Sequence, residues 1–491
     1  MKLFPIRGGV RLPSRKATAD QPIQKASLPP LLRVPMNQHI GVAAEPVVKK
    51  GDRVRKGQQI GASPGGVSSP IHAPTSGEIV DIANHTAPHP SGLAEQMIMI
   101  RPDDLDEWAE LPPPLDPSDA SPSAITERIH ACGVVGMGGA TFPTAAKLDL
   151  RSRHRLRTLV INGAECEPYI SVDDRLMRER TAEIVDGIAI LRRVLDVENT
   201  IVAIEDNKPA ALAAIVTEAG AADALEVAAL PSRYPAGSEK HLALMLTGRE
   251  TPSLGLPADV GVIVHNVATV YAVHQAVRLG RPLISRVVTV GGGAVRRSAN
   301  LEVLIGTPIG CLFEQCGGFR EPPTRVLLGG PMMGQAVSSQ QVPVTKGVNG
   351  VLALEKNETT KRRPLPCIRC GQCIAACPCG LEPLTLAALI RKEKLEAAAE
   401  SGLYDCVLCG SCAYVCPSHI PLVQYYAYAK GRLFEIGRVR AHQEELSRLT
   451  KQRQVRLERL ERERAEARAR RKAAKKKPAQ KKLAAAKEIG V

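Results

Sequence analysis

Two cysteine runs constrain this chain more than any other feature of its sequence. CIRCGQCIAACP covers residues 367–378 and CVLCGSCAYVCP covers residues 406–417, and each run reads C-x2-C-x2-C-x3-C-P. Three cysteines at this spacing can hold one face of an iron–sulfur cube, and the fourth, which precedes a proline, binds the other cube in two-cluster ferredoxins. Structural zinc usually takes two separated pairs of ligands instead. The runs therefore predict two [4Fe–4S] clusters.

The spacing also predicts which cysteines share a cluster, because the last cysteine of each run joins the first three of the other run. The predicted ligands are Cys367, Cys370, Cys373 and Cys416 for cluster 1, and Cys377, Cys406, Cys409 and Cys412 for cluster 2. Cys379 is surplus to this pattern, and we interpret it as a packed thiol.

The composition indicates a large protein that we expect in the cytoplasm. Of its 491 residues, 44% are apolar, yet no stretch approaches the 18 consecutive apolar residues of a membrane span. The first residues, MKLFPIRGGV, have no apolar region of signal-peptide length. The net charge of +15 is uneven, since residues 451–491 hold 16 lysines and arginines against 5 glutamates. Clustered cysteines in such a chain indicate metal rather than disulfides.

Short strands and turns between residues 31 and 100 predict a small β-barrel. PVVKKGDRVRKGQQIG (46–61) and PIHAPTSGEIVDI (70–82) are β-branched segments broken by glycine and proline. They resemble the barrel of biotinyl and lipoyl carrier domains. The hairpin GASPGGVSSP (61–70) lacks the lysine that such carriers modify, so we expect a barrel without a swinging arm.

Strands and helices alternate farther along the chain. TLVINGA (158–164) and NTIVAIED (199–206) are apolar strands, and residues 181–195 carry helical spacing. This alternation predicts an α/β layer. Its loops hold candidate ligand-binding residues, because α/β sheets bind ligands at the carboxyl ends of their strands. The glycine-rich turn GVVGMGGATFPTAAKL (133–148) can cradle phosphate with its backbone amides.

The order of four motifs, GMGGATFPTAAK, NGAECEP, YPAGSE and HNVAT, resembles the flavin- and NADH-binding subunit of respiratory complex I. The resemblance implies noncovalent FMN, with NADH as substrate, and it implies Glu167 and Glu239 near the nicotinamide and ribose. Hydride transfer needs no general base, so we nominate no catalytic residue. The cofactor-binding residues implied are Gly136, Gly138, Gly139, Phe142, Lys147, Asn162, Glu165, Glu167, Tyr234, Gly237, Glu239 and Asn266.

The barrel and the second ferredoxin run are features of another family. Together with VPMNQHIG (34–41), IGTPIGCLFEQCGG (305–318) and GGPMMG (329–334), they resemble the C subunit of the Rnf, or Rsx, ion-translocating electron-transport complex. The resemblance implies a peripheral subunit on the cytoplasmic face of the bacterial inner membrane. Electrons would pass from NADH through FMN and both clusters to integral-membrane and ferredoxin-type subunits, coupled to ion translocation.

The predicted fold is therefore a multidomain α/β plus β protein. Its expected parts are an N-terminal extension (1–30), a lipoyl-like barrel (31–100), a linker (101–122), a Rossmann-like FMN/NADH domain (123–284), an SLBB-like β-grasp insert (285–355), a two-cluster ferredoxin domain (360–432) and a basic helical or disordered tail (433–491).

Two alternatives remain open at this point. One is a soluble NADH-dependent flavin and iron–sulfur dehydrogenase, or diaphorase. The other is an electron-relay scaffold with a degenerate flavin site, because Met137, Ala164 and Ser238 depart from the complex I motifs. The basic tail is either a solvated extension or a contact for anionic lipid. No aromatic residue follows Phe434 to stack on bases, so specific nucleic-acid binding is not expected.

Overall fold

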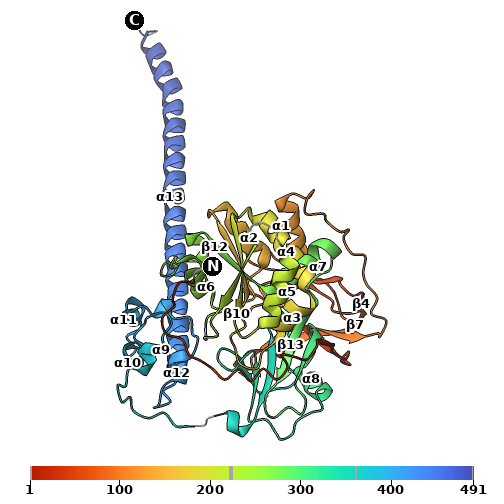
Figure 1. Ribbon diagram of the computed structural model, residues 1–491. Helices are drawn as coiled ribbons and strands as arrows, with labels where there is room; N and C mark the ends of the chain where they lie inside the picture. Colours follow the sequence, from red (N-terminus) through yellow and green to blue (C-terminus); the bar gives the residue numbers. More distant parts are fainter. Residues whose placement is uncertain (1–2, 221–224, 360–361, 489, 491) are drawn as a thin grey trace.

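The computed structural model describes residues 3–220, 225–359, 362–488 and 490. Four sheets organise this part of the chain, and a long C-terminal helix leaves it at one side (Figure 1).

Two antiparallel sheets form the N-terminal barrel, with strand orders β2-β8-β7-β4 and β3-β5-β6. Alternate residues point inward, so that Leu32, Ile60 and Ile98 are completely buried between the two sheets. The segment expected to be a linker packs on this barrel, where the Lys56 ammonium lies 4.8 Å from the Trp108 ring. The strands are β2 (Leu32–Pro35), β3 (Glu45–Pro46), β4 (Arg53–Val54), β5 (Gln59–Ala62), β6 (Ile71–His72), β7 (Gly77–Thr86) and β8 (Ala94–Pro102).

The α/β layer has a parallel sheet of order β11-β10-β9-β12. Strands β9, β10 and β12 are apolar on both faces, and helices cover both faces of the sheet. In β9, Leu159 and Ile161 pack with α4 and α7, whereas Val160 packs with α6. The elements are α1 (Pro122–Ala131), α2 (Thr144–Leu148), η1 (Asp149–Ser152), β9 (Thr158–Gly163), α3 (Val172–Glu179), α4 (Thr181–Leu195), β10 (Asn199–Glu205), α5 (Pro209–Ala219), β11 (Leu225–Leu230), α6 (Glu239–Thr247), η2 (Pro257–Val260), β12 (Val262–Asn266) and α7 (Val267–Leu279).

A mixed sheet of order β1-β14-β13-β17-β15-β16 follows the α/β layer. The segment expected to be an N-terminal extension supplies its edge strand, because Gln24 and Lys25 pair with Leu301 and Glu302. Helix α8 buries Phe313 in the sheet's core. The elements are β1 (Gln24–Lys25), β13 (Ser285–Gly291), β14 (Ala299–Leu304), α8 (Ile309–Gln315), β15 (Arg325–Leu328), β16 (Gln335–Val337), β17 (Gly350–Leu354) and η3 (Lys356–Glu358).

Short helices carry the cysteine runs and pack against the start of the C-terminal helix. Leu422, Tyr426, Ala429 and Leu433 form the buried stripe of that helix. The elements are α9 (Gln372–Ala376), α10 (Pro383–Arg391), α11 (Leu395–Glu400), η4 (Leu403–Asp405), α12 (Ser411–Tyr414) and α13 (Leu422–Glu488).

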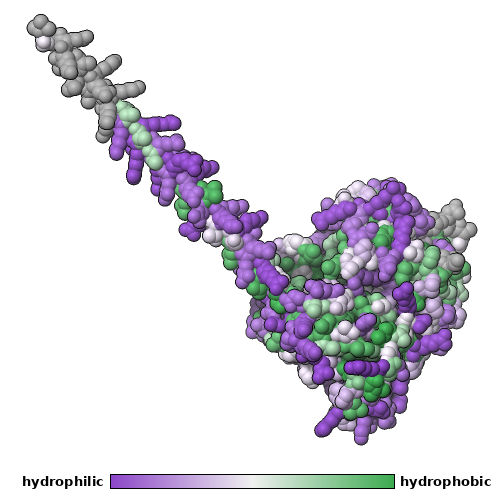
Figure 2. Space-filling view, turned by 90° about the vertical axis from the view of Figure 1, so that its left-hand side faces the viewer, coloured by the Kyte–Doolittle hydropathy of each residue, from purple (hydrophilic) through white to green (hydrophobic). Residues whose placement is uncertain are grey.

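Beyond Leu433, helix α13 projects from the body as a rod with a mostly hydrophilic surface (Figure 2). The sequence predicts a helix that decays into low complexity, whereas the structure continues the helix to Glu488. Alanine, lysine, arginine and glutamate are strong helix formers, which accounts for the helix as far as Pro478, itself a poor helix former. In the described part of the chain, none of the helices combines the length and the apolar character of a membrane span.

Candidate functional site

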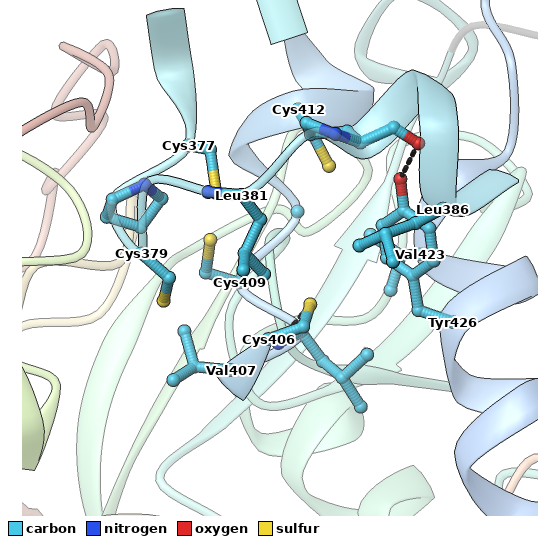
Figure 3. A pocket seen from close by; sticks show the side chains of 14 residues that line it. Cys377, Cys379, Leu381, Leu386, Cys406, Val407, Cys409, Cys412, Val423 and Tyr426 are labelled. Atoms are coloured by element: carbon cyan, nitrogen blue, oxygen red, sulfur yellow. Dashed lines mark hydrogen bonds between the residues drawn. The ribbon is translucent and has the colours of Figure 1, made fainter. Parts of the chain in front are cut away.

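The cysteines of the two runs divide into four that line a cavity and four that lie at or near the surface. Cys377 of the first run lies with Cys406, Cys409 and Cys412 of the second run around one cavity (Figure 3). We call these four residues the inner thiol group. Cys379 lines the same cavity, and its remaining walls include apolar side chains of α10 and α13.

The other four cysteines face the outside of the molecule. Burial raises the pKa of the Cys373 thiol, and the nearby Cys416 and Cys367 raise it further. Cys367 and Cys370 are exposed, and Cys373 and Cys416 are half-buried. We call these four residues the outer thiol group.

The thiols have the environment that iron–sulfur clusters need. Backbone N–H groups of Leu381 and Leu408 donate to the Sγ atoms of Cys377 and Cys406, at 3.4 Å each, and hydrogen bonds to ligand sulfur tune such clusters. In the described residues, no three His, Cys, Asp or Glu side chains are placed to share one metal ion. The inner thiols are instead spread around a cavity (Figure 3), which fits ligands that each bind a different iron.

The glycine-rich turn lies open at the edge of the α/β layer. Gly136 N donates to Phe142 O at 2.8 Å, and Met137 N donates to the Thr269 hydroxyl at 2.8 Å. Residues 138–140 are exposed, and a methyl group on Gly139 would meet no atom within 4 Å. This open backbone fits a phosphate-bearing cofactor such as FMN.

The structure brings several predicted site residues together beside this turn. Gly138 packs against Asn266, which caps α7 by accepting the Ala268 N–H at 2.9 Å. Lys147 donates to Glu239 Oε1 at 2.6 Å. Asn162 donates to Gly237 O at 2.9 Å. The ends of β9 and β12, the start of α6 and the glycine turn therefore meet at one place.

The two glutamates of the loop after β9 have other partners. Glu165 is buried and accepts the Asp173 N–H at 2.6 Å, at the start of α3. Glu167 accepts the backbone N–H groups of Met332 and Met333, both at 2.9 Å, and so ties this loop to the segment after β15. Burial raises the pKa of both carboxyls.

Sequence reasoning missed two buried lysines that hold the same loop. Lys208 donates to Ala164 O at 2.7 Å and to Glu205 Oε2 at 2.9 Å. Its position three residues after the apolar strand β10 was the available signal. Lys16 donates to the backbone carbonyls of Glu165 and Glu167, at 3.0 and 3.1 Å. Nothing in the local sequence distinguishes Lys16 from a solvated lysine.

Tyr234 connects the α/β layer to the inner thiol group. Its ring is buried, and its hydroxyl donates to Cys409 O at 2.7 Å. A second contact lies nearby, where His241 Nε2 is 3.2 Å from Pro378 O. The inner thiol group therefore lies against the α/β layer, which carries the flavin motifs, whereas the outer thiol group is turned toward solvent.

Comparisons with protein-family models agree with this architecture. The RnfC barrel sandwich hybrid domain matches residues 4–105, the Nuo51 FMN-binding domain matches 129–275, the SLBB domain matches 287–336 and the 4Fe-4S dicluster domain matches 366–420. The fold and the site thus define an electron-transfer flavoprotein with FMN and two iron–sulfur clusters as its cofactors.

Curated relatives narrow the class to one family. The C subunit of the ion-translocating oxidoreductase complex of Rhodobacter capsulatus is 53% identical over 89% of this chain and 84% of that protein. The protein of the same name from Pseudomonas aeruginosa is 48% identical over 94% of this chain and 60% of its own length. The chain belongs to the family of C subunits of ion-translocating oxidoreductase complexes, and other subunits of the complex are its partners.

A third relative carries a more specific name. The C subunit of the proton-translocating ferredoxin:NAD(+) oxidoreductase complex of Clostridium ljungdahlii is 46% identical over 87% of this chain and 93% of that protein. Among solved structures, an NAD+-reducing [NiFe]-hydrogenase in the air-oxidized state aligns over 56% of this chain and 54% of its own, with 22% identity and a TM-score of 0.43.

Proposed function

We propose that this chain takes electrons from NADH at its α/β layer and delivers them to integral-membrane and ferredoxin-type subunits that translocate ions. It works as a peripheral subunit on the cytoplasmic face of the bacterial inner membrane. The observation that carries this proposal is the position of the two thiol groups. The inner group contacts the flavin-motif layer through Tyr234, and the outer group is exposed, where a partner can reach it.

Each thiol group holds one [4Fe–4S] cluster in this proposal, with the four ligands of each cluster as predicted from the run spacing. The flavin motifs hold FMN beside NADH. When bound, flavin accepts two electrons as a hydride and releases them one at a time, which suits single-electron carriers. The proposed cofactor-binding residues are Gly136, Gly138, Gly139, Phe142, Lys147, Asn162, Tyr234, Gly237, Glu239 and Asn266, and Glu165 and Glu167 contribute by holding the loop after β9 in place.

The chain's own residues position these groups and exclude water. The open amides of residues 138–140 receive the phosphate, and Lys147 offers a cation whose present partner, Glu239, is itself half-exposed. Glu167 keeps the loop after β9 in place through the amides of Met332 and Met333. The buried side chains of Tyr234 and Val10 pack with Cys409. They keep water out of the contact between the α/β layer and the inner thiol group.

The finer fold assignments form part of the same proposal. The parallel sheet and its helices support a Rossmann-like domain over residues 123–284, and the mixed sheet supports a β-grasp insert over 285–355. The basic tail is proposed to approach anionic lipid, because basic residues near such a surface contribute about 1 kcal/mol each.

An anaerobic titration with NADH tests the proposal. The purified chain is supplied with FMN, and absorbance and EPR spectra follow the flavin and the clusters. We expect flavin bleaching together with the signals of reduced clusters. Clusters that are reduced by dithionite but ignore NADH would contradict the proposal and favour a relay scaffold without a working dinucleotide site.

A further inference from the structure

The N-terminal segment contacts both the α/β layer and the inner thiol group. We call residues 4–18 the strap. Phe4 N donates to Met245 O at the end of α6, at 2.9 Å. Lys16 reaches the backbone carbonyls of the loop after β9, and beyond the strap the chain enters the mixed sheet as β1. In Figure 1 this red segment passes α9 before it turns toward β13.

Two consecutive glycines allow the strap to contact both the inner thiol group and the α/β layer, at the junction where these two parts meet. Gly8 has φ +57°, and a Cβ there would lie 2.4 Å from Cys377 O. Gly9 has φ +75°, and a Cβ there would lie 2.7 Å from Tyr234 O. Both are left-handed conformations that favour glycine, and both leave no room for a side chain. One glycine thus contacts an inner thiol residue, and the next contacts the α/β layer.

Hydrogen bonds fix the strap in this position. Gly9 N donates to Ala376 O at 3.0 Å, next to Cys377 in the chain. Val10 and Tyr234 exchange two backbone hydrogen bonds, at 2.8 and 2.9 Å, as a short antiparallel bridge. The buried Val10 side chain packs with Tyr234, Ala376 and Cys409. At Gly8, Gly9 and Val10 the strap therefore contacts both the α/β layer and the inner thiol group.

We propose that the strap sets the spacing between the α/β layer and the inner thiol group, and that Gly8 and Gly9 are its positioning residues. The inference rests on the proposed function, because it assumes that electrons cross this junction. A side chain at either glycine pushes the strap away from Cys377 or from Tyr234. The α/β layer and the inner thiol group then move apart, although none of the proposed cofactor-binding residues has been substituted.

The test compares Gly8→Ala and Gly9→Ala with Gly51→Ala in the full chain loaded with FMN and clusters. Gly51 is a matched control, because it has φ +90° and a Cβ added there would meet nothing within 4 Å, so its variant carries the conformational strain without the collision. A light flash, with EDTA present as a sacrificial electron donor that becomes oxidised, reduces the flavin without NADH, and absorbance then follows electron arrival at the clusters. Hydrogen exchange of the Tyr234 amide, whose partner is Val10 O, reports on strap contact without any electron transfer.

We expect both strap variants to slow flavin-to-cluster transfer by on the order of tenfold, since small misplacements of reacting groups are costly. The Tyr234 amide should exchange faster in both, while Gly51→Ala behaves as wild type. Gly8→Ala acts on the side of Cys377 and Gly9→Ala on the side of Tyr234. If one variant loses a cluster by misfolding, the other still tests the inference. Strap variants that match Gly51→Ala in transfer rate and exchange, or a wild type without flash-driven transfer, would overturn the inference. A wild type that transfers after the flash but ignores NADH would refute only the proposed function.

Discussion

Five cysteines line the cavity of the inner thiol group, and we propose that four of them bind the cluster. Their positions around the cavity do not distinguish these four from Cys379. Cys379 lines the cavity with the inner four, but it falls outside the C-x2-C-x2-C-x3-C pattern. We predict that Cys409→Ser loses about half of the cluster iron, because one of two clusters lacks a ligand. Cys379→Ser should keep it all. Iron analysis of anaerobically purified protein measures both, and equal losses would contradict the ligand assignment.

Glu167 offers a second prediction at this scale. Both of its carboxylate oxygens accept backbone N–H groups, from Met332 and Met333, and such charged hydrogen bonds contribute roughly 1.5–3 kcal/mol. Glu167→Gln keeps the size but weakens these bonds, so we expect faster hydrogen exchange at the two amides and a small change in the KM for NADH. A large rise in KM with unchanged exchange would show instead that the carboxylate contacts the nucleotide.

The candidate site could be predicted only as far as its signals are local. The cysteine runs carry their pairing rule within a few residues, and Asn266 stands at a strand end that the apolar pattern reveals. The motif NGAECEP indicates the loop that holds Glu165 and Glu167, but not the partners of these glutamates. Asp173 N lies across a turn, and Met332 is 165 residues away in sequence. Such partners depend on how domains dock, which no local pattern records.

At the scale of elements, length and periodicity decide what sequence reveals. Helix α4 spans Thr181–Leu195 as the apolar spacing predicts, and β9 and β10 coincide with apolar runs. Strand β1 has two residues and exists only because β14 offers an edge, so it has no signal of its own. The strap depends on collisions that glycine avoids, and these become visible only in three dimensions.

Helix α13 carries a prediction about its basic end. Its buried stripe ends at Leu433, so deletion of residues 451–491 should leave the clusters and FMN in place. We expect the deletion to abolish most binding to vesicles that contain anionic phosphatidylserine, because about 1 kcal/mol per basic residue is lost near the surface. Vesicle co-sedimentation at low and physiological salt measures this. Undiminished binding of the shortened chain would place the lipid contact elsewhere.

At the scale of the whole molecule, one buried lysine joins three parts of the fold. Lys346 donates to Pro70 O, beside the barrel strand β6, at 3.1 Å and to Gly133 O at the start of the glycine-rich turn at 2.7 Å. The residue itself precedes β17 of the mixed sheet. Burial lowers the pKa of its amine from 10.5 to about 7. The amine is therefore neutral in the folded chain over a range where the unfolded chain holds it charged.

The sign of the resulting pH dependence follows from proton counting. Between about pH 7 and 10.5 the unfolded chain binds a proton that the folded chain does not, so this group makes the folded state more stable as pH rises. We expect Lys346→Met to remove that rise. Urea midpoints measured across this window compare it with Lys50→Met, a change at an exposed lysine. A variant that keeps the wild-type slope would exclude Lys346 as its source.

In the proposed path, electrons reach the exposed outer thiol group by way of the inner one. The most direct measurement is the EPR signal of the outer cluster in Cys409→Ser after anaerobic addition of NADH, with wild type alongside. We expect NADH to bleach the flavin in both proteins but to reduce the outer cluster only in wild type, whereas dithionite reduces it in both. Reduction of the outer cluster by NADH at the wild-type rate in the variant would show that electrons do not pass through the inner cluster.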